Sequence, residues 1–205
     1  MIKNIMKISE IFKSFQSEGI YVGYSAIFLR LSGCNIGCTF CDTNYYDYVE
    51  YDVADVCDMI INCCRLNNID LLVITGGEPS LQKEEIKCLI ELLPKDINVQ
   101  IETNGYDYMY LTDDVTYMIS PKKDLEKTFK QYYKYNNCYF KFLIKDEKDL
   151  DEIESLLNKY NYNRRIWLQP LFNRDKEVCR LILKNLYRFK KVNLSTQIHK
   201  YIYIK

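Results

Sequence analysis

The chain reads Ser25-Ala26-Ile27-Phe28-Leu29-Arg30-Leu31 and, after Ser32, Gly33-Cys34-Asn35-Ile36-Gly37-Cys38-Thr39-Phe40-Cys41-Asp42-Thr43. The first run predicts a strand that leads directly into a loop with three cysteines. Cysteines at this spacing suit a cubane iron–sulfur cluster, which takes thiolate ligands from a short loop. Three protein ligands leave one of the four irons open, and an open position on a metal is usually where a substrate binds. The stretch therefore predicts an enzyme with redox chemistry.

Three other interpretations of these cysteines are open at this point. Zinc prefers four ligands in C-x-x-C pairs, but the chain offers one such pair and a single histidine. A thioredoxin-like dithiol of Cys38 and Cys41 leaves Cys34 without a role. Chance clustering of buried thiols is the third interpretation, and Gly33 and Gly37 argue against it because they shape a loop.

The composition narrows the class of protein. The 205 residues, 48% of them hydrophobic, are enough to bury a core without disulfides. The 28 basic and 28 acidic residues balance, so bulk charge gives no reason to expect nucleic-acid binding. The sequence shows no run long enough to span a membrane and no signal peptide at its start, so we expect a cytoplasmic protein. Nine cysteines in such a protein favour reduced thiols and metal ligation over a disulfide framework.

Hydrophobic periodicity predicts alternating strands and helices along the rest of the chain. The expected strands are 25–31, 71–74, 99–101, 115–119, 139–144, 166–168 and 192–194, and the expected helices are 53–64, 86–93, 150–157 and 181–186. Such alternation implies parallel strands joined by right-handed crossovers. About six repeats are too few for an eight-stranded barrel of ~250 residues. We therefore predict an α/β fold, a partial and open barrel of about six parallel strands, as a single domain over residues 1–205.

Polar or glycine-rich segments follow the predicted strands. Because the loops after parallel strands meet at one end of such a barrel, these segments should lie together. They are the cysteine loop, Thr75-Gly76-Gly77-Glu78-Pro79, Glu102-Thr103-Asn104-Gly105, Ser120-Pro121-Lys122, Gln169-Pro170, and residues 195–199.

The C-x3-C-x2-C spacing, with Phe40 before the last cysteine, resembles the signature of radical S-adenosylmethionine (SAM) enzymes, and Gly76-Gly77-Glu78-Pro79 resembles their second motif. The resemblance implies that Cys34, Cys38 and Cys41 hold a [4Fe–4S] cluster whose open iron binds SAM. The two glycines would let the backbone approach the ligand, and Glu78 would accept hydrogen bonds from the methionine ammonium. The cofactor-binding residues that the resemblance implies are Phe40, Gly76, Gly77, Glu78, Glu102, Thr103, Asn104, Ser120, Lys122 and Gln169.

Four further segments resemble the 7-carboxy-7-deazaguanine synthase family. They are residues 10–19, Arg30-Leu31-Ser32-Gly33-Cys34-Asn35, Cys41-Asp42-Thr43 and Gln197-Ile198-His199-Lys200. The resemblance implies conversion of 6-carboxy-5,6,7,8-tetrahydropterin to 7-carboxy-7-deazaguanine in queuosine and 7-deazapurine biosynthesis, with SAM, the cluster and Mg²⁺. It also implies a homodimer and an electron donor such as flavodoxin or ferredoxin.

The same resemblance implies a substrate-binding set of Gln16, Glu18, Arg30, Gly76, His199 and Lys205, with Thr43 as a ligand of Mg²⁺. Arg30 suits the pterin carboxylate, and Gln16 and Glu18 suit the guanidine-like edge of the ring. Ser17 stands where the family usually has glycine, so we expect the turn there to differ. On its own, Arg30 is equally compatible with an ion pair in a strand, and a lone histidine is more often structural.

Two other functions fit parts of this pattern. An activase of a glycyl-radical enzyme would share the cluster and SAM motifs but would bind a partner protein, and Gln16, Glu18 and His199 count against it. A non-enzymatic iron–sulfur or zinc protein would not need Gly76-Gly77-Glu78. Metal content and an absorption spectrum of anaerobic protein would distinguish this last class.

Overall fold

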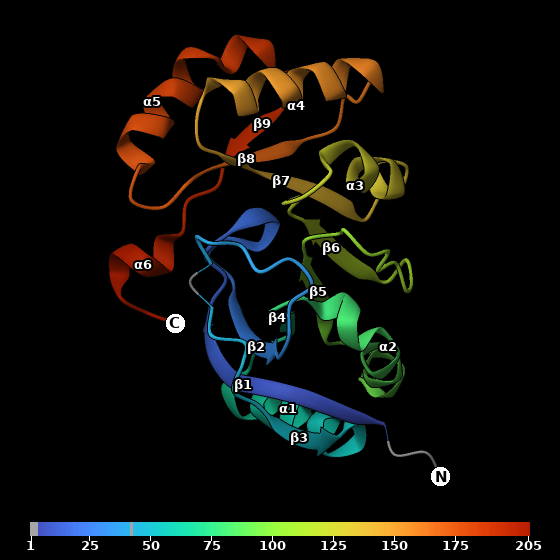
Figure 1. Cartoon of the computed structure of the whole chain (residues 1–205). Coiled ribbons are helices and arrows are strands. Elements are labelled where there is room, and N and C mark those ends of the chain that lie inside the picture. Colours follow the sequence, from blue (N-terminus) through green and yellow to red (C-terminus); the bar gives the residue numbers. More distant parts are fainter. Residues whose placement is uncertain (1–3, 42) are drawn as a thin grey trace.

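The computed structural model describes residues 4–41 and 43–205, whose strands form one sheet in the order β3-β1-β2-β4-β5-β6-β7-β8-β9 (Figure 1). The strands are β1 (Ile5–Phe15), β2 (Ser25–Leu31), β3 (Val49–Asp52), β4 (Leu71–Gly76), β5 (Asn98–Thr103), β6 (Val115–Ile119), β7 (Cys138–Ile144), β8 (Ile166–Pro170) and β9 (Val192–Leu194). Neighbouring strands from β2 to β9 are parallel, whereas β1 is antiparallel to both β2 and β3. The described sheet therefore has seven parallel strands and an antiparallel edge.

Helices follow most of the parallel strands. They are α1 (Val53–Asn67), α2 (Lys83–Leu92), α3 (Leu125–Tyr132), α4 (Glu147–Lys159), α5 (Asp175–Lys184) and α6 (Ile198–Ile202), with single 3₁₀ turns η1 (Gly19–Tyr21), η2 (Pro79–Gln82) and η3 (Leu186–Arg188). The side chain of Asp52 caps α1, and Asp146 and Asp149 form a capping box on α4, so local sequence fixes these helix starts. No helix in the described part of the chain is both long and apolar enough to cross a membrane.

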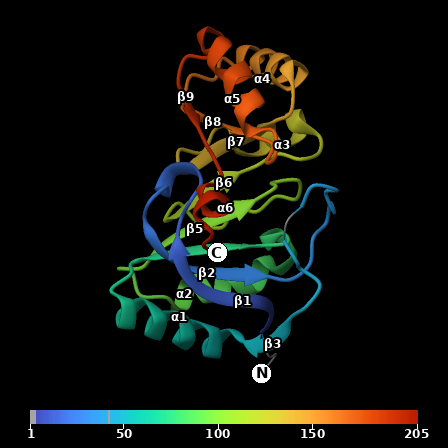
Figure 2. The same ribbon diagram turned by 90° about the vertical axis from the view of Figure 1, so that its left-hand side faces the viewer.

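The two faces of the sheet bury different side chains. A large apolar cluster joins one face to the helices, and it includes Leu72, Ile101 and Phe140. A small separate cluster around Ala26 and Val73 lies on the other face. Figures 1 and 2 show α1 and α2 beside one half of the sheet, α4 and α5 beside β7 to β9, and α6 apart from them near the carboxyl end. The face opposite the large apolar cluster, here called the inner face, is therefore left free to carry polar side chains.

The connection from β1 to β2 enters this inner face. Gly19 has φ 71°, and a Cβ there would lie 2.6 Å from Cε of Met118 on β6. The Tyr21 hydroxyl forms a 3.3 Å hydrogen bond with Thr116 on the same strand. Glycine is favoured at position 19 by its positive backbone angle, and it lets the turn pack closely against the end of the Met118 side chain. This packing sets the position of residues 16–18 just before the turn.

The open, mostly parallel α/β sheet confirms the predicted fold class, with seven parallel strands where about six were expected. The prediction missed β1, β3, α3 and α6. Most of β1 is only half-buried, so it lacks the apolar run that marked the parallel strands. The last long helix was also misplaced: α5 ends at Lys184, and Leu186 begins η3.

Candidate functional site

The three cysteines of the predicted cluster line one cavity of about 240 Å³ at the end of β2. All three are free thiols; Cys34 and Cys38 are half-buried and Cys41 is exposed. Burial raises the pKa of the Cys38 thiol, and the nearby Lys122 ammonium partly offsets that effect. No three described Cys, His, Asp or Glu side chains converge on one metal ion. A four-iron cluster does not require such convergence, because each cysteine binds a different iron, so three thiols around one cavity fit it.

Gly76 and Gly77 pack against the backbone that enters the cysteine loop. A Cβ on Gly76 would lie 2.3 Å from the Leu31 carbonyl oxygen, and a Cβ on Gly77 would lie 1.7 Å from that of Gly33. Two hydrogen bonds close the contact, from Gly77 N to Leu31 O (3.0 Å) and from Glu78 N to Gly33 O (2.7 Å). These glycines were expected to let the backbone approach the ligand, but their closest contacts are with the backbone at the start of the cysteine loop. Gly77 also lines the cavity.

Glu78 is almost fully buried and binds donors from the neighbouring strand end. Its Oε1 accepts from the Thr103 hydroxyl (2.5 Å) and from Ser80 N (3.0 Å), and its Oε2 accepts from Asn104 N (2.8 Å). Burial raises the pKa of this carboxyl, and these hydrogen bonds oppose the rise. Asn104 also donates to Asn35 Oδ1 within the cysteine loop (2.8 Å). Glu78 therefore ties the ends of β4 and β5 together beside the cluster loop.

The remaining predicted cofactor residues that line this cavity lie in the cysteine loop, which holds Phe40, and at the ends of later strands. They are Phe40, Glu102, Ser120, Lys122 and Gln169. The ammonium of Lys122 donates to the Ser120 hydroxyl (2.7 Å). Surrounding protein and the positive Lys141 lower the pKa of Lys122 to about 8, although water reaches its side chain through the cavity.

A second cavity, of about 520 Å³, adjoins the first and collects the predicted substrate-binding side chains. Gln16, Glu18, Arg30, His199 and Lys205 all line it. Gly76 is absent from its lining, because its neighbours are the Leu31 backbone atoms. The predicted set thus converges with the exception of that glycine.

Arg30 faces this second cavity from the end of β2. Its Nη1 donates to the Thr43 hydroxyl (3.3 Å), its guanidinium lies 5.4 Å from the Phe12 ring centre, and its Nε is 3.8 Å from Glu10 Oε2. The ion pair with Glu10 is too long to use the planar fork of the guanidinium, which would bind a carboxylate in bidentate fashion. Asp42, which precedes Thr43 in the motif, lies outside the described residues.

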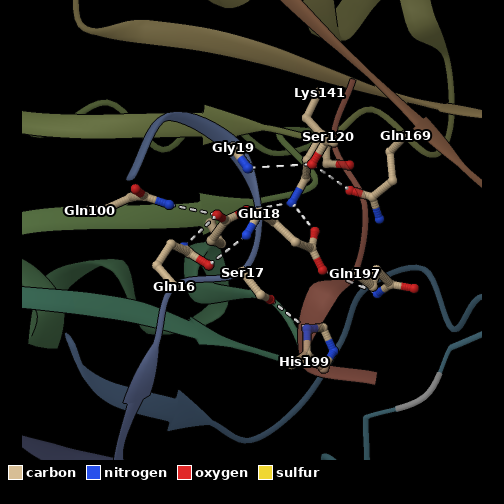
Figure 3. A network of polar contacts seen from close by, with 12 residues as sticks. Gln16, Ser17, Glu18, Gly19, Gln100, Ser120, Lys141, Gln169, Gln197 and His199 are labelled. Atoms are coloured by element: carbon tan, nitrogen blue, oxygen red, sulfur yellow. Dashed lines mark hydrogen bonds and ion pairs between the residues drawn. The ribbon is translucent and has the colours of Figure 1, made fainter. Parts of the chain in front are cut away.

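The carboxyl-terminal segment reaches the same cavity through polar contacts. Ser17 Oγ lies 2.5 Å from His199 Nδ1, and Gln197 Nε2 donates to Glu18 Oε1 (3.1 Å; Figure 3). Lys205 hydrogen-bonds Ser14 through its carbonyl oxygen and pairs with Glu10 through its ammonium. The backbone at Ser17 does not need glycine, since its φ is not positive. The serine adds a hydroxyl contact with the histidine.

Lys141 on β7 joins two of the predicted residues and was missed in the sequence. Its ammonium lies 2.5 Å from Glu18 Oε2 (Figure 3). The same ammonium lies 3.0 Å from Glu102 Oε2. Burial disfavours each charge, but the two carboxylates raise the pKa of Lys141 and the ammonium lowers that of Glu18. Burial, together with the Glu18 charge, raises the pKa of Glu102 despite Lys141. A single charge inside the apolar run 139–144 was the sequence signal for this residue.

The two cavities share part of their lining. The residues common to both are Glu18, Thr43, Thr75, Glu102, Lys141, Gln197 and Lys200. A molecule in the cysteine-lined cavity and a molecule in the second cavity would therefore meet at this shared wall. Such an arrangement can bring a reactive group of one ligand to an atom of the other.

Comparison with known proteins agrees with this architecture. Residues 29–120 match the family described as the Radical SAM superfamily. The chain is 43% identical over 121 residues to a 7-carboxy-7-deazaguanine synthase of Rickettsia prowazekii, covering 57% of this chain and 51% of the relative. It is 31% identical to that of Methanospirillum hungatei over 96% of this chain and 85% of the relative. The crystal structure of QueE from Escherichia coli has the same fold, with a TM-score of 0.72, 23% identity and 93% of each chain covered. The chain belongs to the 7-carboxy-7-deazaguanine synthase family of radical SAM enzymes.

Proposed function

We propose that this enzyme converts 6-carboxy-5,6,7,8-tetrahydropterin to 7-carboxy-7-deazaguanine and ammonia, with the pterin in the cavity that contains Arg30 and His199. The observation that supports this proposal is the shared wall between two cavities, one lined by the cluster cysteines and the other by the predicted pterin residues. Family membership supplies the reaction class.

The cofactor side of the site is formed by Cys34, Cys38 and Cys41, which would hold the cluster, and by the polar residues around the first cavity. When bound, the cluster and SAM supply a radical by reductive cleavage of the sulfonium. Glu78, Ser120 and Lys122 offer an acceptor, a hydroxyl and a cation for the amine, ribose and carboxylate of SAM. Glu78 has unused acceptor capacity, since its two oxygens bind three donors and can bind about four.

The pterin side uses matched hydrogen-bonding groups. Arg30 would bind the substrate carboxylate through its fork, which the Glu10 contact leaves available. Gln16 and Glu18 would accept from the ring nitrogen and amino group of the pterin edge. His199, oriented by Ser17, presents its other ring nitrogen as a further contact. The protein's contribution is to hold the pterin beside SAM and to limit the entry of water.

Thr43 would provide a hydroxyl ligand for Mg²⁺ at the boundary of the two cavities. It lines both cavities, and its hydroxyl lies 3.3 Å from Arg30 Nη1. Mg²⁺ takes oxygen ligands and keeps several waters, so one protein hydroxyl together with substrate oxygens is a suitable set.

The enzyme would consist of a single domain and form a homodimer. It would receive electrons from a flavodoxin or ferredoxin. One continuous sheet from β3 to β9 supports a single domain over residues 1–205. Exposed apolar side chains, among them Phe15 at the pterin cavity and Tyr24, Leu194 and Ile202 elsewhere, support burial against a second copy. The incomplete burial of the cysteines leaves the cluster loop accessible to an electron donor.

The deciding experiment is anaerobic incubation of the reconstituted enzyme with reductant, SAM, Mg²⁺ and carboxytetrahydropterin, with mass detection of the product. We expect 7-carboxy-7-deazaguanine and one ammonia per turnover. Arg30→Ala should weaken pterin binding while leaving SAM binding unchanged. A reconstituted enzyme that cleaves SAM but yields no deazaguanine would contradict the proposal, and unchanged pterin affinity in Arg30→Ala would contradict the carboxylate role.

A further inference from the structure

We propose that Lys141 is a positioning residue for the pterin, which holds Glu18 and Glu102 as an oriented pair of carboxylates between the two cavities. This inference rests on the proposed function, because the ligand that the pair would bind is the pterin. No sequence motif pointed to Lys141; its burial, its contacts and its place in the shared wall carry the inference.

The three charged groups form a cluster on the inner face of the sheet. The side chains of Lys141, Glu18 and Glu102 are 7%, 14% and 15% exposed. They come from three separate places: β7, the turn after β1, and β5. With both carboxylates ionised, the cluster carries two negative charges and one positive charge. A buried group of this kind costs several kcal/mol per ion in desolvation, so it is weak evidence for a role in stability alone.

Donors from the protein fix both carboxylates. Each carboxylate places one oxygen on the Lys141 ammonium, and the other oxygens bind side-chain amides. Gln197 donates to Glu18 Oε1 (3.1 Å), while Gln16 and Gln100 donate to Glu102 Oε1 (3.2 and 2.5 Å). Glu18 therefore has one protein donor on each oxygen, and an ionised carboxylate can accept about four. The remaining acceptor positions are fixed in direction and free for a ligand.

Lys141 is also the group that keeps this pair charged. Without the ammonium, two buried carboxylates would face each other, and one of them would take up a proton. A protonated carboxyl donates a hydrogen bond where the N–H edge of a pterin needs an acceptor. The ammonium has three protons, and Glu18 and Glu102 are its acceptors among the described residues, so one proton is available at the boundary of the cavities.

Other charged groups face this cluster and contribute to any pH dependence. They are Arg30 from β2, Glu78 after β4, Cys38 in the cluster loop, Lys122 after β6, and His199 and Lys200 from α6. All of them are retained in a variant at position 141. A comparison between such a variant and the wild type therefore isolates the effect of the ammonium.

The test measures pterin binding by the unreduced holoenzyme, with its cluster and SAM bound, so that no turnover occurs. Carboxytetrahydropterin is titrated by anaerobic equilibrium dialysis between pH 6 and 9, and SAM affinity is measured in parallel. The variants are Lys141→Met and Lys141→Arg, with Lys184→Met on the exposed face of α5 as the matched control. We expect Lys141→Met to bind the pterin about 30-fold more weakly or worse.

Two signatures separate positioning from general damage. The apparent pKa for pterin binding should rise by about one unit or more in Lys141→Met, and Lys141→Arg should restore most of the affinity. Lys141→Met with wild-type pterin affinity would overturn the inference, as would an equal loss of pterin and SAM binding with no pKa change. A wild-type holoenzyme that binds no pterin would instead refute the proposed function.

If Lys141→Met fails to retain its cluster, the double variant Lys141→Met with Glu102→Gln restores the net charge of the group while still lacking the ammonium. We expect this variant to bind the pterin more weakly than the wild type, but with an apparent pKa close to the wild-type value. Wild-type affinity in the double variant would show that the ammonium is not needed.

Discussion

Replacement of Gly77 by alanine should displace the cluster loop, even though the new side chain is a single methyl group. The ideal Cβ would lie 1.7 Å from the carbonyl oxygen of Gly33 and 2.4 Å from its carbonyl carbon. Real Cβ contacts are not shorter than 3.0 Å, so the two segments must move apart by about 1.3 Å, the difference between 1.7 and 3.0 Å. Both partners are backbone, so no rotation of a side chain can relieve the contact.

The cost follows from the contacts that this movement breaks. Separation of the segments removes the hydrogen bonds from Gly77 N to Leu31 O and from Glu78 N to Gly33 O, each contributing about 1 kcal/mol. Overpacking adds ~1–3 kcal/mol. The free energy of unfolding should therefore fall by roughly 3–5 kcal/mol, which in a chain of this size lowers the melting temperature by roughly 10 °C.

The measurements are thermal unfolding of the apoprotein and iron content after anaerobic reconstitution. Gly23→Ala is a matched control, because Gly23 has φ 89° but no atom within 4 Å of the place that a Cβ would occupy. That control carries backbone strain of ~1–2 kcal/mol without a clash, so it should lose some stability and keep its iron. A Gly77→Ala protein that melts at the wild-type temperature and binds full iron would refute the packing argument.

Three further predictions test other parts of the site. Cys38→Ala should lose the cluster absorption and all turnover; an intact cluster spectrum would contradict the ligand assignment. Ser17→Ala should weaken pterin binding by roughly 5-fold through loss of one hydrogen bond to His199, with SAM affinity as the internal control. Because the pKa of Glu18 is lowered in the folded state, its contribution to stability is present above the unfolded pKa near 4.5 and is lost as the pH falls through the lower folded value. Denaturant unfolding between pH 3 and 6 should therefore depend less steeply on pH in Glu18→Gln, and an unchanged slope would contradict the pairing with Lys141.

The sequence could predict the central parallel strands because they are largely buried on both faces. Leu71 to Ile74 and 139–144 are nearly continuous apolar runs, which is the pattern of a central parallel strand. The antiparallel edge could not be predicted in the same way. Much of β1 is half-buried, and a register shift between Ile8 and Glu10 interrupts its alternation. Local pattern thus identifies a strand most readily where burial is complete or regular.

The same distinction applies to the site. The cysteines and Gly76-Gly77-Glu78 were predictable because each motif consists of residues that are close in sequence and lie in a single loop. Lys141 depends on partners 123 and 39 residues away, and the Gln197 contact with Glu18 spans 179 residues. No local spacing encodes such contacts, because the sheet order and the turn around Gly19 create them.

The division of the site into two cavities corresponds only in part to a division of the chain, because Arg30 of the second cavity lies inside residues 29–120, and Lys122 and Gln169 of the first cavity lie outside them. The segment that matches the radical SAM superfamily, residues 29–120, contains the cluster cysteines, Glu78 and Ser120 on the cofactor side. Gln16, Glu18 and His199 lie outside it. Glu18 N donates to Gln16 Oε1, and the hydroxyl of the intervening Ser17 contacts His199 Nδ1. Lys141 also lies outside this segment, yet it binds Glu102 within it. The ion pair therefore connects Glu18, proposed to bind the pterin, with Glu102, proposed to bind the cofactor. Changes at Lys141 should for this reason affect how the two ligands are aligned more than how either cavity folds.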